Sequence, residues 1–160
     1  MKGMANFTTA IMVAAIDSPL YRINYQQRSN MKPTLLQEIY PVLISEIAKN
    51  ETTCQSVGDV VAYFKAKIAE NPKVQFIGVF DHYAHTKNSG GEIAPEIQGA
   101  VGVILCFGFA LPNPQVLAVR PRSIGVTDLY DKFVVSFLET PMKPANEAMV
   151  AWANGLRNKC

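Results

Sequence analysis

Hydrophobic and polar positions alternate with a period of two in SPLYRINYQQ, residues 18–27. Tyr21, Ile23 and Tyr25 share one side, which is typical of a half-buried β-strand. After Thr34, apolar residues recur at helical spacing. This second pattern predicts a helix from Thr34 to Asn50 that Pro41 kinks or divides.

A further helix has a clearer start signal. Ser56 and Asp59 form an S-x-x-D capping pattern, and Asn71-Pro72 marks the end of the helix. Its apolar stripe consists of Val57, Val60, Val61, Phe64 and Ile68. The following segment KVQFIGVFDHY, residues 73–83, predicts a strand that is buried on much of both faces.

The segment GAVGVILCFGF, residues 99–109, predicts another strand, and its two faces differ in side-chain size. The small face carries Ala100, Gly102, Ile104, Cys106 and Gly108. Small side chains leave space above a sheet for a close-packed helix or for a ligand. Close packing of a helix is the commoner use of such a face and is the one we expect.

The last third of the chain predicts two strands and a helix. SIGVTDL and DKFVVSFLE form two strands joined at Tyr130-Asp131, and Pro144 suits the first turn of a terminal helix. LPNPQVLAVRPR, residues 111–122, fits either a turn with a short helix or a strand. The order is strand, helical pair, four strands, helix. It predicts an α+β fold in which helices cover one face of an antiparallel sheet.

Composition narrows the class of protein. A chain of 160 residues favours one domain over residues 1–160. The net charge of +2 comes with dispersed basic pairs, so we expect no nucleic-acid partner. The 3 cysteines form no CxxC pair, which favours reduced thiols and a cytoplasmic protein. Secretion is the alternative, because the apolar stretch Ala10 to Ile16 follows Lys2; no run is long enough to span a membrane.

Three stretches together resemble domain-of-unknown-function family 302 over about Ser56 to Pro141. They are FDHYAHTKNSGGEIAPE, VILCFGFALPNP and SIGVTDLYDKFVVSFLETP. The resemblance implies a fold similar to the TATA-binding-protein architecture, usually a dimer, with no established activity. It also implies a short helix over Pro114 to Arg120. The predicted helix Thr34 to Asn50 and the short last hairpin depart from the family pattern, so no binding surface is carried over.

The segment Asp-His-Tyr-Ala-His holds the two histidines of the chain. The Asp-His pair of family 302 corresponds to Asp81 and His82, whereas His85 is not part of that pattern. On a strand, Asp81 and His82 point to opposite faces and form no dyad. His82 and His85, with Glu92 or Cys106, would bind a transition metal or haem. The alternative is a strand-end histidine that a backbone carbonyl satisfies.

Other candidate ligand contacts lie later in the chain. Arg120 and Arg122 flank Pro121 and would hold an anionic ligand as a fork, unless they are a solvated surface pair. Trp152 on the terminal helix, with Cys106 on the small strand face, would border a cavity between helix and sheet, unless both are core residues.

No recognised catalytic motif is present: the chain has no G-x-S-x-G, H-E-x-x-H or P-loop pattern. We therefore predict a non-enzymatic domain that self-associates and binds a small ligand between its sheet and its terminal helix. The apolar residues 1–17 are the predicted means of self-association. The alternative is a metal- or haem-binding protein that uses His82 and His85.

Overall fold

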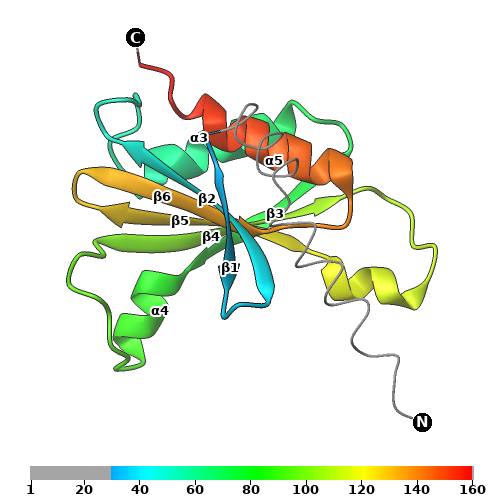
Figure 1. Cartoon of the computed structure of the whole chain (residues 1–160), viewed down its shortest axis with the longest axis horizontal. Helices are drawn as coiled ribbons and strands as arrows, with labels where there is room; N and C mark the ends of the chain where they lie inside the picture. The colour runs from blue at the N-terminus through cyan, green and yellow to red at the C-terminus, as the bar shows by residue number, and fades with distance from the viewer. Residues whose placement is uncertain (1–29, 160) are drawn as a thin grey trace.

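The computed structural model describes residues 30–159, and this part of the chain begins with a β-hairpin (Figure 1). Strands β1 (Lys32–Leu36) and β2 (Tyr40–Ala48) pair antiparallel. The helix predicted from Thr34 to Asn50 is therefore wrong. The predicted strand 18–27 and the apolar segment 1–17 lie outside the described residues.

The hairpin forms because β2 has a buried face with a period of two. Leu43, Ser45 and Ile47 are buried at alternate positions. Leu43 and Ile47 are also four residues apart, so the same residues fit a helical spacing. The turn gave no signal either, because its positive φ angles of 52° and 62° belong to Gln37 and Glu38 rather than to glycine or asparagine.

From Ser56 onward the structure confirms the positions of the predicted helices and strands. Their bounds are α3 (Val57–Ala69), β3 (Val74–Asp81), β4 (Gly99–Phe107), β5 (Arg122–Leu129), β6 (Lys132–Leu138) and α5 (Lys143–Gly155). Strand β3 is an edge strand without a fully buried residue, so the expectation that it is buried on much of both faces is wrong. A capping box between Ser56 and Asp59 starts α3. The 3-10 helix η1 (Pro114–Val119) confirms the short helix implied by the family resemblance.

One element was not predicted. The strand expected to reach Tyr83 ends at Asp81, and helix α4 (His82–Asn88) follows it directly. His82 is therefore helical, and the expectation that Asp81 and His82 point to opposite faces of a strand does not apply.

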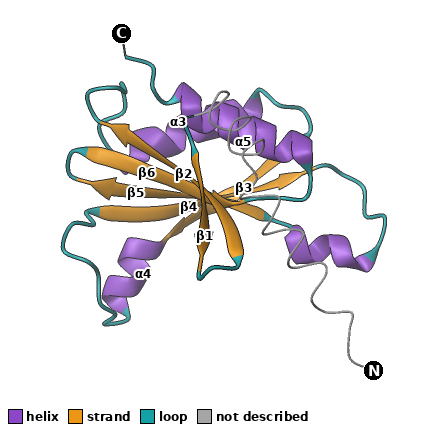
Figure 2. Ribbon diagram, in the orientation of Figure 1, coloured by secondary structure: helices purple, strands orange, loops and turns teal. Residues whose placement is uncertain are grey.

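The strands form one antiparallel sheet in the order β1-β2-β6-β5-β4-β3. Helices α3 and α5 lie together on one side of this sheet (Figure 2), which confirms the predicted α+β fold. The smaller α4 lies on the opposite side (Figure 1). None of the helices among residues 30–159 is long and apolar enough to cross a membrane.

The core lies between the sheet and the two long helices. Its largest fully buried side chains include Phe64, Phe133, Leu105, Met149 and Leu156. The Tyr63 hydroxyl of α3 also donates a 2.8 Å hydrogen bond to the Trp152 carbonyl of α5. These contacts hold α3, α5 and the sheet as one packed unit.

The helices pack on the large face of β4, which corrects the expectation that they would use the small face. Val103, Leu105 and Phe107 are buried beneath them. Packing on these side chains removes more apolar area from water than packing on glycine and cysteine would. The small face of β4 consequently lies on the other side of the sheet.

Candidate functional site

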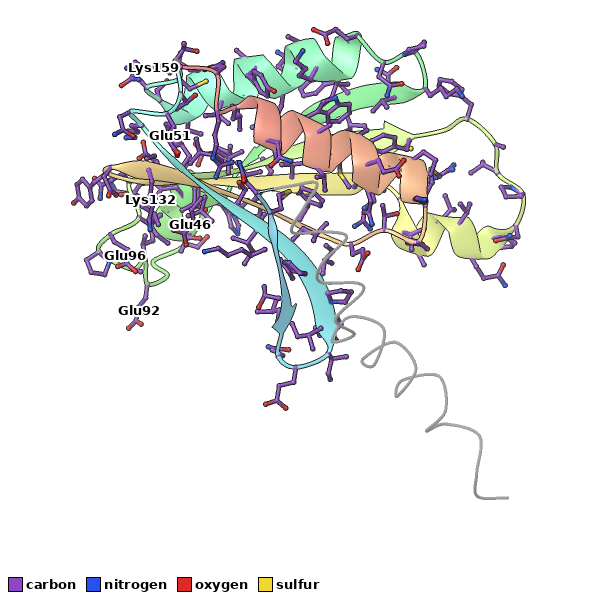
Figure 3. All side chains as sticks on the ribbon, turned by 45° about the horizontal axis from the view of Figure 1, so that its top comes forward. Glu46, Glu51, Glu92, Glu96, Lys132 and Lys159 are labelled. Atoms are coloured by element: carbon purple, nitrogen blue, oxygen red, sulfur yellow. The ribbon has the colours of Figure 1, made fainter. Side chains whose placement is uncertain are left out.

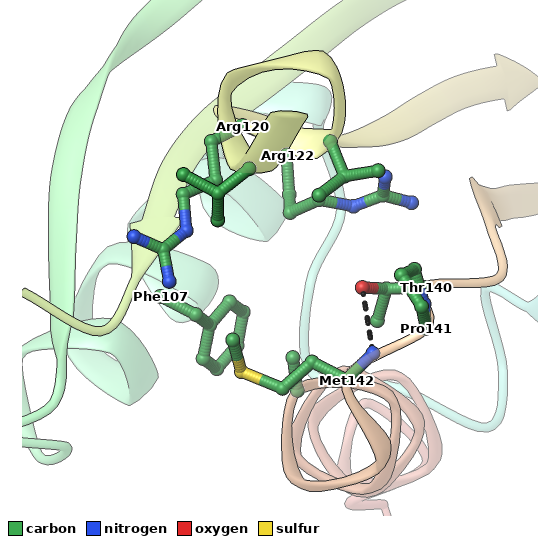
Figure 4. Close-up of a pocket in the computed structure, with 9 residues that line it drawn as sticks. Phe107, Arg120, Arg122, Thr140, Pro141 and Met142 are labelled. Carbon is green, nitrogen blue, oxygen red and sulfur yellow. Dashed lines mark hydrogen bonds between the residues drawn. The ribbon is translucent and has the colours of Figure 1, made fainter. Parts of the chain in front are cut away.

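A cavity of about 230 Å³ opens between η1, the start of β5 and the N-terminus of α5 (Figure 4). It is called the arginine cavity below. Its lining residues are Phe107, Val116, Val119, Arg120, Arg122, Thr140, Pro141, Met142 and Ala145. Most of this wall is apolar, and the two arginines supply its only charged groups among these residues.

Both guanidinium groups are held by backbone carbonyls. Arg120 Nη1 donates a 2.8 Å hydrogen bond to the carbonyl of Ala110. Arg122 Nη2 donates to the carbonyls of Leu138 and Glu139, which lie at the end of β6. In Figure 4 the Arg120 guanidinium extends toward Phe107 and the Arg122 guanidinium extends to the other side. The two side chains therefore frame the cavity instead of forming the predicted fork.

Arg122 retains unused donor capacity. Its Nε is buried and has no hydrogen-bond partner. Within residues 30–159, no carboxylate forms an ion pair with Arg120 or Arg122. Burial lowers the pKa of the Arg122 guanidinium because desolvation disfavours the charged form. Arg122 is thus a partly desolvated cation, and no carboxylate of residues 30–159 neutralises it.

The opposite wall is the turn that leads into α5. The Met142 amide donates a 3.3 Å hydrogen bond to Thr140 Oγ1 (Figure 4), and the Thr140 amide donates one of 2.8 Å to Asn146 Oδ1. Met142 is the N-cap residue of α5 and provides no side-chain cap. The positive end of the helix dipole therefore adds to the positive potential of the two arginines.

Asp81, His82 and His85 lie on the other side of the sheet, around α4. Asp81 caps this helix, because its Oδ1 accepts a 2.8 Å hydrogen bond from the Ala84 amide. Both imidazoles contact the Phe80 ring, with centroid distances of 4.7 Å for His82 and 5.3 Å for His85. His82 also lines a second hollow with Arg122, on the far side of β5 from the arginine cavity.

The two histidines meet no third metal ligand in the described part of the chain. Residues 30–159 contain no group of three His, Cys, Asp or Glu side chains placed to hold a metal ion. Glu92 and Cys106, the proposed additional ligands, do not join His82 and His85 in such a group. The arrangement provides aromatic contacts around Phe80 and a helix cap, rather than a closed coordination shell.

Cys106 and Trp152 do not line the arginine cavity. Cys106 is half-buried on the small face of β4, away from α5. Trp152 lies in the core, where its ring stacks on Phe107 at a centroid distance of 5.9 Å. The predicted pairing of these residues around a helix-sheet cavity therefore does not occur, because they occupy opposite sides of the sheet.

Most residues of the cavity wall had no functional signal in the sequence. Val116 and Val119 reach it because Asn113 caps η1 by accepting a 3.2 Å hydrogen bond from the Val116 amide. The Asn-Pro pair at residues 113–114 was the available signal for this turn. Thr140 and Met142 carried no comparable signal.

Comparisons with known proteins give one match. Residues 31–158 match the model of a family of unknown function (DUF6858). This match confirms a domain of unknown function but does not support family 302 in particular. No curated protein and no solved structure matches the chain.

Proposed function

The chain belongs to the DUF6858 family, and from that premise we propose that it is a non-enzymatic domain that binds a small anion in the arginine cavity. The observation that carries the proposal is the buried Arg122 Nε, which has no hydrogen-bond partner beside an apolar cavity. A buried donor without a partner costs about 1–3 kcal/mol. A ligand oxygen that reached this atom, which requires the side chains around it to move, would remove that cost.

The walls define the chemistry of the ligand. Two guanidinium groups and a helix N-terminus favour a carboxylate or another small anion. Val116, Val119 and Phe107 favour an apolar group attached to it. The combined preference is for an amphipathic anion, whose charge lies at the arginines and whose apolar part contacts η1.

The volume limits the size of the ligand. About 230 Å³ corresponds to roughly eight water molecules at about 30 Å³ each. Pockets for drug-sized ligands occupy about 300–1,000 Å³. We therefore expect a short-chain acid, or the carboxylate end of a longer molecule.

The wall also supports a binding role over a catalytic one. Its nine residues include no His, Cys, Asp or Glu side chain that would act as a general base or an activated nucleophile. The Thr140 hydroxyl accepts a hydrogen bond from the Met142 amide, and no base lies beside it among the lining residues.

The first test compares hexanoate with hexanol, which has a similar apolar chain but no charge. Methyl NMR of Met142 and Ala145 would follow both titrations. We expect hexanoate to shift these methyl signals saturably and to bind about tenfold more tightly than hexanol, because charge-assisted hydrogen bonds exceed neutral ones.

Two variants locate the binding site. Arg122→Gln should weaken hexanoate binding about tenfold or more, whereas Lys87→Gln, which removes an exposed charge from α4, should leave it unchanged. Because Arg122 also holds the end of β6, Arg120→Gln provides a second reduction of charge with a different backbone contact. Equal affinity for hexanol and hexanoate would contradict the proposal, as would full hexanoate binding by both arginine variants.

A further inference from the structure

Among residues 30–159, only α4 covers part of the side of the sheet that points away from α3 and α5. This side is called the open face. Its side chains on the central strands are Val42, Ile44, Glu46, Val134, Ser136, Leu138, Ser123, Thr127, Ile104 and Cys106. Helix α4 covers only one corner, where the His82 imidazole lies against Gly102. Within residues 30–159, no helix covers strands β2, β6 and β5 on this side.

The open face is mixed in composition and carries little net charge. Ile44, Val134 and Ile104 are half-buried and Leu138 is 45% exposed, and serine and threonine side chains lie between them. Glu46 and Lys132 pair with each other at 2.9 Å (Figure 3), whereas Lys32, opposite Ile44 on β1, adds one positive charge. A surface with one net charge neither attracts a strongly charged partner nor strongly repels a copy of itself.

Both edges of the sheet disfavour association through strand addition. The edge strand β1 is five residues long and contains Lys32 and Pro33. The other edge strand, β3, has an irregular register between Phe76 and Gly78. Short edges, proline, lysine and bulges are the features that prevent edge-to-edge pairing. If the sheet associates with another protein chain, packing on the open face is therefore favoured over strand pairing at an edge.

The dimensions of the open face fit a small subunit interface. Six strands at about 4.8 Å spacing span about 24 Å, and seven residues along a strand span about 23 Å. The flat projection is thus about 550 Å² before the corner under α4 is subtracted, and side-chain relief adds to it. Two such faces bury about 1,100 Å², close to the roughly 1,000 Å² expected of a biological interface and below the standard size of about 1,600 Å². A dimer would therefore use all of the face that α4 leaves open.

From these observations we infer that a second copy of this chain packs on the open face, so that two sheets lie face to face across a two-fold axis. We propose a copy of the chain as the occupant because the face carries little net charge and its area reaches the lower range of interfaces between subunits. Residues 1–29, which precede the described part, are the competing occupant. The two alternatives differ in a measurable way, because only a second copy makes coverage depend on protein concentration.

The rate of Cys106 alkylation measures how far the open face is covered, and it does so without a substitution on that face. Cys106 lies on the open face and is half-buried, whereas Cys54 is buried in the core. In the full chain with Cys160→Ser, the rate of Cys106 alkylation would be measured across a wide range of protein concentration. We expect the rate to fall about tenfold or more as dimer forms. A rate that does not change with concentration would overturn the inference and would favour coverage by residues 1–29.

A pair of variants tests the location of the interface. Ile44→Lys places a charge on the uncovered part of the open face, and Ala66→Lys places the same charge on the exposed side of α3. Light scattering should show that Ile44→Lys lowers the dimer mass to that of a monomer and that Ala66→Lys does not. Circular dichroism would confirm that both variants fold. A monomeric wild-type chain, or a folded dimeric Ile44→Lys variant, would refute the inference.

Discussion

The two faces of the sheet follow the same strands but are built from different residues. Along β4, Val103 and Leu105 are completely buried beneath the helices, while their neighbours Ile104 and Cys106 are half-buried on the open face. The helix-covered face supplies the hydrophobic core. The open face contributes less buried area to folding and is therefore free to serve recognition.

The largest expected difference between the faces concerns leucine removal. Leu105→Ala should lower the free energy of unfolding by about 2–5 kcal/mol, because it leaves a cavity in the core. Leu138→Ala should cost less than about 1 kcal/mol, since that side chain is already 45% exposed. Urea denaturation of both variants at one low protein concentration would measure the contrast. Equal costs would mean that the open face is as tightly packed as the core.

A methyl group added at Gly102, on the open face, should press against the His82 side chain of α4. A Cβ at Gly102 would lie 3.1 Å from His82 Nε2 and 3.2 Å from Ser123 Oγ. We expect Gly102→Ala to cost about 1–3 kcal/mol through overpacking. Part of this cost should disappear when His82 is also replaced by alanine, as a double-mutant cycle of unfolding free energies would show.

Gly78 is the matched control for Gly102. It lies on β3, and a Cβ there would meet no atom within 4 Å. Gly78→Ala should therefore be neutral or slightly stabilising, because alanine restricts the unfolded chain. A similar loss in both glycine variants would show that the strand backbone, rather than the His82 contact, sets the cost.

The smallest expected effect is a pH-dependent change in stability at Asp59, at the start of α3 on the helix-covered side. Hydrogen bonds from the Gln55 amide, the Ser56 hydroxyl and the Ser56 amide lower the pKa of Asp59. A lowered folded-state pKa gives stability above the unfolded-state value, and this stability is lost as pH falls through the folded-state value. Asp59→Asn should reduce the acid-induced loss of stability in thermal unfolding, whereas Glu70→Gln at the end of α3 should not remove this cap-dependent component.

The sequence predicted α3, α5 and the strands β3 to β6 because each had a local signal, whereas the short helix α4 was missed. The Ser56 capping pattern and the Asn113-Pro114 turn act within a few residues and survive in the fold. Leu43 and Ile47 had no such support, since their spacing fits both periods and only pairing with β6 decides between them. Long-range pairing is the information that a single local pattern does not contain.

The candidate site was predictable only in part for the same reason. Arg120 and Arg122 were identified because they flank Pro121 in the sequence, and both line the cavity. The opposite wall of the cavity includes Thr140 and Met142, which come from the turn after β6. Their position next to the two arginines therefore depends on the sheet topology. His82 and Asp81 attracted attention as adjacent polar residues, yet the start of α4 gives Asp81 a capping role.

Arg122 connects the two surfaces proposed here. Its guanidinium binds the carbonyl of Leu138, whose side chain belongs to the open face, while the same arginine lines the cavity. An anion that changes the position of Arg122 would also act on the end of β6. If it changes the affinity of one copy for another, thermodynamic reciprocity requires that dimerisation change the affinity for the anion by the same factor. The strand end at Leu138 would then couple anion binding in the cavity to assembly of the protein.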